Sequence, residues 1–217
     1  KESEHFSFEL SIEDALAYLA KTKPIDYKSV LKVHEILFSG FYPWAGKDRC
    51  ELVPHLAVFK GLHGDPRSTV FEHPNSIKMS VDYALELAAN QKRFRDRPGE
   101  VMGQLAFAHP FLDGNGRTIL LVFMELCYRA RFAIDWSKTT KDDYLRALSD
   151  EIREPRERHL DHYLQPFVVD IASRDEWPAT ISISSIRGLD GLDKEGITYE
   201  NLDNPEVQQI YKTYRAR

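Results

Sequence analysis

The chain has 217 residues, of which 42% are hydrophobic and 29% charged, and its formal net charge is −5. This composition is that of one sizeable globular domain, and its mild acidity argues against nucleic acid as the main partner. No apolar stretch approaches the roughly 20 residues that span a bilayer, so we expect no membrane association. Cys50 and Cys127 stand without a metal-binding spacing, which suits a reducing compartment and argues against disulfides and a structural zinc site.

The first half of the chain predicts three helices around an irregular stretch. Apolar residues at helical spacing predict one helix over residues 11–22, with Ser11 as its N-cap. A second helix is predicted from just after Pro24 to Gly40. Residues 41–76 lack this periodicity and are rich in proline, glycine and histidine. Within them, two apolar runs at 56–59 and 70–71 predict a small hairpin. A third helix is expected over 76–91.

The second half predicts further helices over 99–108, 115–130, 141–152 and 157–173, and Pro166 should kink or split the last of these. The helix at 115–130 is apolar nearly all round, so we expect it at the centre of the fold. Residues 180–183 alternate like a strand, and a polar helix is expected near 205–214. We therefore predict a mainly α-helical protein with a small β element. Its expected parts are an N-terminal helical segment (1–23), a catalytic domain (24–174) and a C-terminal extension (175–217).

One loop, at 109–117, carries the chemistry: His-Pro-Phe-Leu-Asp-Gly-Asn-Gly-Arg lies between two apolar helices. Gly114 and Gly116 let a ligand approach the backbone, and the N-terminus of the next helix adds to an anion cradle. Arg117, in the first turn of that helix, can contact phosphate through a charge-assisted hydrogen bond. Asn115 can either donate to a phosphate oxygen or shape the turn.

Two further residue types complete the loop. Asp113 is a hard oxygen ligand suited to Mg²⁺, and His109 titrates near neutrality and can act as a general base. Taken singly, a His-Pro pair often just ends a helix, and an Asp-Gly-Asn-Gly stretch is often just a turn. The combination in one loop favours activation of a hydroxyl group beside a metal-bound polyphosphate.

This loop resembles the signature HPFx[DE]GN[GK]RxxR of the Fic family, and residues 42–49 (YPWAGKDR) are similar to a second Fic stretch, F/Y-P-W-A-G-x-x-R. The resemblance covers roughly residues 24–174. It implies a Fic-like helical bundle with a small β-hairpin flap. It also implies a protein adenylyltransferase, which moves AMP from ATP to a Tyr, Thr or Ser hydroxyl of a target protein. Some members transfer other phosphate-containing groups, and the Doc branch phosphorylates its target.

Carried over by position, the resemblance implies that His109 deprotonates the target hydroxyl and that Asp113 holds Mg²⁺ on the α- and β-phosphates. Phe111 would anchor the loop in the core. The implied nucleotide-binding residues are Gly114, Asn115, Gly116 and Arg117. The flap that holds the target through backbone hydrogen bonds is expected at Ser68, Thr69, Val70 and Phe71, the alternative being an ordinary surface hairpin.

The signature's second arginine is replaced here by Leu120. Another cation could substitute, although Arg129 and Arg131 lie far along the chain from the loop. Otherwise the donor differs (UTP, GTP, CDP-choline or phosphoryl transfer), or AMP transfer is weaker by a phosphate contact of about 1.5–3 kcal/mol. A non-catalytic nucleotide-binding module is the remaining alternative.

Regulation should also differ, because the family's inhibitory motif [ST]xxxE[GN] is not found in the chain. We expect no self-restraint by a glutamate that pairs with the missing arginine. Control would come from a separate antitoxin-like protein, from a removed segment or from poor intrinsic activity. The expected location is the cytoplasm, or a host cytoplasm after delivery.

Overall fold

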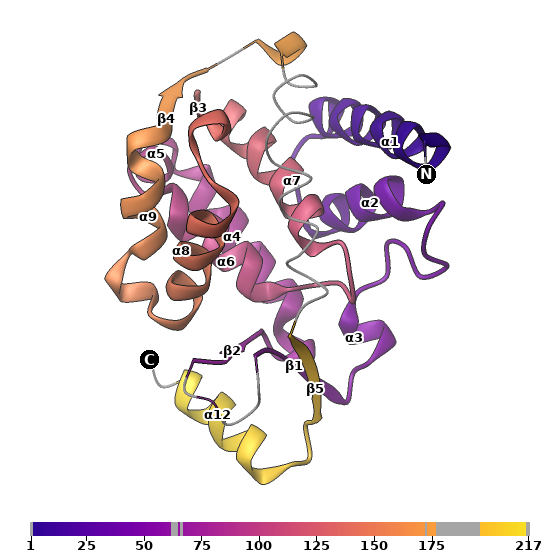
Figure 1. Cartoon of the computed structure of the whole chain (residues 1–217), viewed down its shortest axis with the longest axis vertical. Coiled ribbons are helices and arrows are strands. Elements are labelled where there is room, and N and C mark those ends of the chain that lie inside the picture. Colours follow the sequence, from indigo (N-terminus) through magenta and orange to yellow (C-terminus); the bar gives the residue numbers. More distant parts are fainter. Residues whose placement is uncertain (1, 62–64, 66, 172, 177–195, 216–217) are drawn as a thin grey trace.

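The computed structural model describes residues 2–61, 65, 67–171, 173–176 and 196–215 (Figure 1). The α-helices are α1 (Glu2–Lys21), α2 (Tyr27–Phe38), α3 (Arg49–Leu52), α4 (Ile77–Ala89), α5 (Gln91–Asp96), α6 (Pro98–Ala108), α7 (Asn115–Arg129), α8 (Lys141–Arg153), α9 (His159–Leu164) and α12 (Pro205–Arg215). The strands are β1 (Leu56–Lys60), β2 (Thr69–Val70), β3 (Phe132–Ile134), β4 (Val168–Asp170) and β5 (Ile197–Asn201). Short 3-10 turns are η1 (Pro74–Ser76), η2 (Trp136–Lys138), η3 (Pro155–Glu157), η4 (Gln165–Phe167) and η5 (Arg174–Glu176). The predicted mainly α-helical fold is confirmed.

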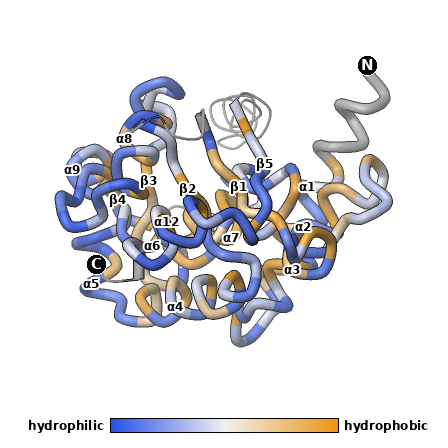
Figure 2. Tube along the Cα trace, turned by 90° about the horizontal axis from the view of Figure 1, so that it is seen from below, coloured by the Kyte–Doolittle hydropathy of each residue, from blue (hydrophilic) through white to orange (hydrophobic). Residues whose placement is uncertain are grey.

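Helix α7 lies at the centre of the fold and packs against α1, α2, α6 and β3. Nearly all of its side chains between Thr118 and Cys127 are buried, as its continuous apolar sequence predicted. The outer helices are amphipathic: along α4, hydrophobic and hydrophilic turns alternate in Figure 2. Among the helices that the structure describes, none has the length and apolar character needed to cross a bilayer.

Most predicted helices are confirmed to within three residues, but α1 and α5 differ. Helix α1 already begins at Glu2, well before the expected cap at Ser11. Helix α5 was not predicted: the expected helix over 76–91 ends where α5 begins. The break arises at Asn90, whose side chain accepts a hydrogen bond from the Arg93 N–H (3.1 Å) and so starts a new helix.

The predicted long helix over 157–173 is wrong beyond its first turns. Helix α9 ends at Leu164, and Pro166 lies in the 3-10 turn that follows, so the predicted split is correct. The chain then becomes strand β4, which pairs antiparallel with β3. The strand expected at 180–183 lies outside the described residues.

The predicted hairpin forms, and it belongs to a three-stranded sheet ordered β2-β1-β5. The third strand, β5, comes from the C-terminal extension and pairs with the whole length of β1. Ala57 and Phe59 face α12, whereas Val58 faces the main helical core. The sheet and α12 therefore lie together at one end of the molecule (Figure 1).

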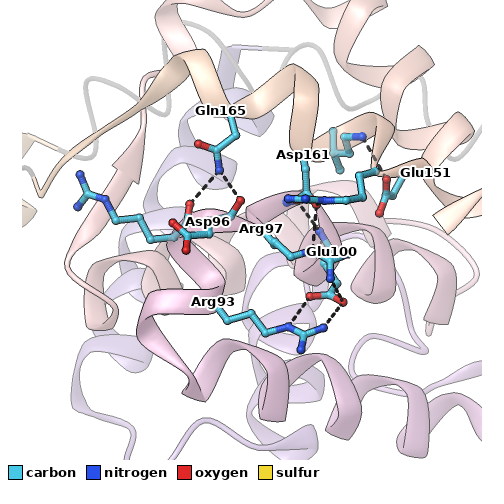
Figure 3. A network of polar contacts seen from close by, with 11 residues as sticks. Arg93, Asp96, Arg97, Glu100, Glu151, Asp161 and Gln165 are labelled. Atoms are coloured by element: carbon cyan, nitrogen blue, oxygen red, sulfur yellow. Dashed lines mark hydrogen bonds and ion pairs between the residues drawn. The ribbon is translucent and has the colours of Figure 1, made fainter. Parts of the chain in front are cut away.

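A buried carboxylate fixes the start of α6, the helix that leads into the 109–117 loop. Asp161 accepts hydrogen bonds from the N–H groups of Gly99 (2.8 Å) and Glu100 (3.3 Å), and its other oxygen pairs with Arg97 and Arg158. Figure 3 shows Asp161, on α9, lying against Arg97 and Glu100 at the start of α6. An acidic group at a helix N-terminus satisfies its unpaired N–H groups and its dipole.

Glu151 lies beside this network and should make stability depend on pH. It is buried on α8 and accepts a hydrogen bond from the Leu160 N–H (3.1 Å). Burial, assisted by the charge of Asp161, raises the pKa of Glu151 from 4.5 to about 7. As the pH rises, this carboxyl ionises in the unfolded chain at a lower pH than in the folded protein. Its contribution to the free energy of unfolding is therefore present at low pH and is lost as the pH rises from 4.5 to 7.

We expect Glu151→Gln to escape this loss, because glutamine keeps an acceptor oxygen and does not ionise. The free energy of unfolding of the variant minus that of the wild type should increase by about 2–3 kcal/mol between pH 4.5 and pH 7.5. Urea denaturation at several pH values measures the gain. Glu154→Gln, at an exposed carboxylate near the end of the same helix, is the control. A difference that does not change with pH would contradict the prediction.

Candidate functional site

Two left-handed residues shape the bend between α6 and α7. His109, with φ 42° and ψ 61°, caps the end of α6, and α7 follows Gly114, with φ 82°. A Cβ atom on Gly114 would lie 2.5 Å from Cε2 of Phe38. Position 114 therefore requires glycine both for its backbone conformation and for the space beside Phe38.

The Asn115 side chain closes the loop on itself. Its Oδ1 accepts from the Phe111 N–H (2.8 Å), its Nδ2 donates to the Phe111 carbonyl (2.7 Å), and Nδ2 lies 3.3 Å from Nε2 of His109. Of the two roles that the sequence left open for this side chain, the structure shows the shaping of the turn.

Phe111 and His34 anchor the loop in the core. Phe111 is fully buried, as predicted, and its ring stacks on His34 with centroids 3.8 Å apart. His34 Nδ1 accepts from the Gly46 N–H (2.9 Å), so Nε2 is left to donate to the Asp113 carbonyl (2.9 Å). Burial lowers the pKa of His34 to about 4, so the ring is neutral at pH 7. No pattern in the sequence pointed to His34.

Arg49 holds the start of the loop and was also missed as a site residue, although it lies in the 42–49 stretch. Its side chain is completely buried. Nε donates to the His109 carbonyl (2.5 Å), and Nη2 donates to the carbonyls of Glu72 (2.8 Å) and Ala108 (3.3 Å). Its backbone N–H donates to the Pro110 carbonyl (2.7 Å). Desolvation lowers the pKa of Arg49 only to about 10, so the guanidinium stays charged at pH 7. It links the end of α6 to Glu72, which follows the hairpin.

The His109 imidazole is buried, with 5% of the residue exposed, and stacks on Phe71 with ring centroids 3.9 Å apart. Burial and the nearby charges of Arg49 and Lys60 hold the pKa of His109 well below its ordinary value. The ring is therefore neutral at pH 7, as a general base must be. It lines a cavity of about 30 Å³, to which Phe71 and Gly116 also contribute.

Asp113 fits the expected magnesium ligand. Its carboxylate is partly exposed; Oδ1 accepts from the Gly114 N–H (2.7 Å) and Oδ2 from the Tyr42 hydroxyl (2.5 Å). Each oxygen keeps lone pairs for a cation. The described residues contain no group of three or more His, Cys, Asp or Glu side chains that could hold a metal. A single carboxylate suits Mg²⁺, which is often held by one carboxylate, water and substrate phosphates.

Arg117 and Gly116 lie at the start of α7, where the anion cradle was expected. The Arg117 guanidinium lies over the Phe38 ring, 4.6 Å from its centroid, and is half-buried. Gly116 lines the same cavity as His109. The two residues thus flank the loop on different sides of the first helical turn.

The four residues expected in the flap lie beside the loop but on two faces of the hairpin. Thr69 and Phe71 line the cavity with His109. Ser68 and Val70, with Thr69, line a separate groove of about 570 Å³ that the end of α8 and α12 complete. The outer edge of β2 thus borders a space large enough for a peptide segment.

Leu120 has 1% of its surface exposed and packs in the main core. It does not line the cavity at His109. Arg129 is engaged at the other end of α7, where it pairs with Glu125 (3.0 Å) and donates to the carbonyls of Leu19 and Thr22. Neither residue supplies a cation beside the loop.

Comparison with known proteins identifies related proteins. The model of the Fic/DOC family matches residues 24–127. The protein adenylyltransferase VbhT of Bartonella schoenbuchensis is 28% identical over 152 residues. That alignment covers 63% of this chain but only 30% of the length of VbhT.

Solved structures share the fold. The BepC protein of Bartonella tribocorum, determined with bound AMPPNP, superposes with a TM-score of 0.58 at 17% identity, covering 79% of this chain and 89% of that one. The N-terminal Fic domain of a VirB-translocated Bep effector protein from Bartonella quintana, with bound ADP, gives a TM-score of 0.56 at 19% identity, covering 74% and 82%.

Proposed function

We propose that the chain is a member of the Fic/DOC family, whose model matches residues 24–127. We further propose that it is a protein adenylyltransferase, which transfers AMP from ATP to a Tyr, Thr or Ser hydroxyl of a target protein. One observation carries the proposal. The neutral imidazole of His109 lies next to the N-terminus of α7, and the Asp113 carboxylate lies at the same end of that helix. The activity named for VbhT and the nucleotides bound in the two Bartonella structures support the same conclusion.

In this mechanism the target hydroxyl attacks the α-phosphorus and passes its proton to the His109 imidazole. The bond from the α-phosphorus to the bridging oxygen breaks, and pyrophosphate leaves. Burial, together with the charges of Arg49 and Lys60, makes a charged imidazolium unfavourable, so His109 should release the proton again readily. Asp113 would hold Mg²⁺, which neutralises phosphate charge when bound. Gly114, Asn115, Gly116 and Arg117 would line the phosphate site, where N–H groups of the first turn of α7 and the Arg117 guanidinium would be the donors.

The target would bind along the flap. Among the described residues, strand β2 lies at one edge of the sheet and has no partner strand on its outer side, whereas β1 is paired on both sides. Backbone pairing at Thr69 and Val70 would place a target segment in the groove beside α8 and α12.

We place the catalytic unit within residues 24–174, completed by the C-terminal extension. A separate inhibitor protein and action in the cytoplasm, or in a host cytoplasm, remain part of the proposal. The likeness to BepC, a VirB-translocated effector protein, supports delivery.

A second candidate is a transferase of the same type with another donor. The buried Leu120, where the family signature has arginine, favours it, because a leucine makes no charged contact to a terminal phosphate. UTP, GTP, CDP-choline and γ-phosphoryl transfer belong to this candidate.

Labelled nucleotides separate the candidates. The purified chain is incubated with Mg²⁺, a cell lysate and ATP carrying the label at either the α- or the γ-phosphate. We expect protein labelling from the α-position alone. Labelling from the γ-position alone would indicate phosphorylation. Labelling only from UTP, GTP or CDP-choline would indicate another donor. No labelling, with nucleotide bound, would indicate a non-catalytic module.

A further inference from the structure

Asp113 is held at three of its atoms, each by a different donor. Its backbone carbonyl accepts from Nε2 of His34 (2.9 Å), its Oδ1 from the Gly114 N–H (2.7 Å) and its Oδ2 from the Tyr42 hydroxyl (2.5 Å). Of these donors, the Tyr42 hydroxyl is the one that reaches the carboxylate from a distant part of the sequence, 71 residues before it. The orientation of this carboxylate therefore depends on the 42–49 stretch as well as on the loop.

The Tyr42 ring is itself held in place by aromatic neighbours. It stacks on Trp44 with ring centroids 4.4 Å apart and on Phe38 with centroids 5.4 Å apart. Trp44 in turn stacks on His34, at 5.7 Å between centroids. Because packing already fixes the ring, the hydrogen bond to Asp113 costs little further conformational entropy.

Such an arrangement matters for a magnesium ion that takes few ligands from the protein. Mg²⁺ demands near-ideal octahedral geometry and is often held by one or two carboxylates together with water and substrate phosphates. The fewer ligands the protein supplies, the more the orientation of each one matters. Hydrogen bonds to a ligating carboxylate fix that orientation. Each Asp113 oxygen accepts one printed hydrogen bond of this kind and keeps lone pairs for a cation.

We propose that Tyr42 is a positioning residue, whose hydroxyl holds the Asp113 carboxylate in the orientation that binds the Mg²⁺ of the nucleotide. This inference rests on the proposed function and deepens it, because it gives the 42–49 stretch a part in metal binding. Tyr42 acts through Asp113. Its effect on nucleotide binding should therefore depend on Mg²⁺, whereas a purely structural role would change nucleotide binding with and without the metal.

The test titrates ATP calorimetrically into the wild type, Tyr42→Phe, Asp113→Ala and Tyr163→Phe, once with Mg²⁺ and once with EDTA. Phenylalanine keeps the ring that stacks on Trp44 and removes only the hydroxyl. Tyr163, on α9, provides a matched loss of a tyrosine hydroxyl, since its oxygen accepts from the Thr140 N–H (3.1 Å) beside the start of α8. Thermal unfolding, with and without ligand, checks that each variant is folded and gives a second measure of binding.

We expect Tyr42→Phe to weaken ATP binding in Mg²⁺ by about tenfold. This is the lower end of the 10- to 100-fold range for residues that orient metal ligands, because water and phosphates hold the ion as well. The affinity of Tyr42→Phe in EDTA should equal that of the wild type. Asp113→Ala should lose at least as much affinity in Mg²⁺, and Tyr163→Phe should equal the wild type in both conditions.

An affinity of Tyr42→Phe in Mg²⁺ that is within twofold of the wild type, or higher, would overturn the role of Tyr42 and leave the proposed function intact. An equal loss in Mg²⁺ and in EDTA would do the same. Unchanged binding by Asp113→Ala would remove Asp113 as the metal ligand, and the role of Tyr42 with it. No binding of ATP by the wild type in Mg²⁺ would overturn both the role of Tyr42 and the proposed function.

Discussion

Replacing His109 with asparagine should reduce AMP transfer by about 10²- to 10⁴-fold, the usual contribution of a general base. Asparagine is suited to this position, because it tolerates the left-handed backbone conformation that His109 adopts (φ 42°) better than most residues. It cannot take a proton from a hydroxyl group at neutral pH. The initial rate of protein labelling from α-labelled ATP measures the loss.

Two controls isolate the chemistry from the fold. MgATP affinity and the midpoint of thermal unfolding should stay close to those of the wild type. His162→Asn, at an exposed histidine of α9, should label proteins at the wild-type rate. Undiminished labelling by the His109→Asn variant would remove this imidazole from the mechanism.

Replacing Arg49 with methionine should lower the free energy of unfolding by about 3–5 kcal/mol, because three carbonyl oxygens around a buried site lose a charged donor. These carbonyls belong to Glu72, Ala108 and His109. They lie on the flap side and at the end of α6, so the variant should also loosen the bend that carries His109. Transfer activity should fall even below the unfolding temperature.

Chemical denaturation of the wild type, Arg49→Met and Arg49→Lys measures this effect. Lysine keeps the charge but lacks the fork that reaches several carbonyls, so its stability should lie between the other two. Arg67→Met is the matched control, since the Arg67 side chain is 86% exposed and pairs only at the surface with Asp65. A loss below about 1 kcal/mol for Arg49→Met would show that the loop does not depend on this guanidinium.

The helical part of the fold could be predicted because apolar spacing records which face of a helix is buried. Helix α7 is the clearest case: its continuous apolar run predicted its central position. The strands were harder. Val168 continues a helical spacing in the sequence, but Pro166 ends the helix before it and β3 offers an edge to pair with. Strand β5 has no alternation that predicts its partner, since pairing with β1 is decided by the fold.

Within the site, the loop residues could be chosen from residue type and order, whereas their supports could not. Arg49 and His34 act on backbone groups of the loop from 60 and 79 residues away in sequence. A hydrogen bond between a side chain and a carbonyl far away in the sequence produces no periodic pattern in that sequence. The same holds for Lys60, which only the register of β1 brings beside His109. The roles of the loop residues in transfer stay predictions until the experiments above are done.

The pairing of β5 with β1 ties the last part of the chain to the hairpin next to His109. Trimming the protein at residue 174, where a sequence-based boundary would fall, would strip one side of β1 and uncover Ala57 and Phe59, which α12 now shields. An unpaired strand edge beside an exposed apolar surface favours self-association of the protein. We therefore expect a shortened domain to stay monomeric only if it keeps these carboxyl-terminal residues.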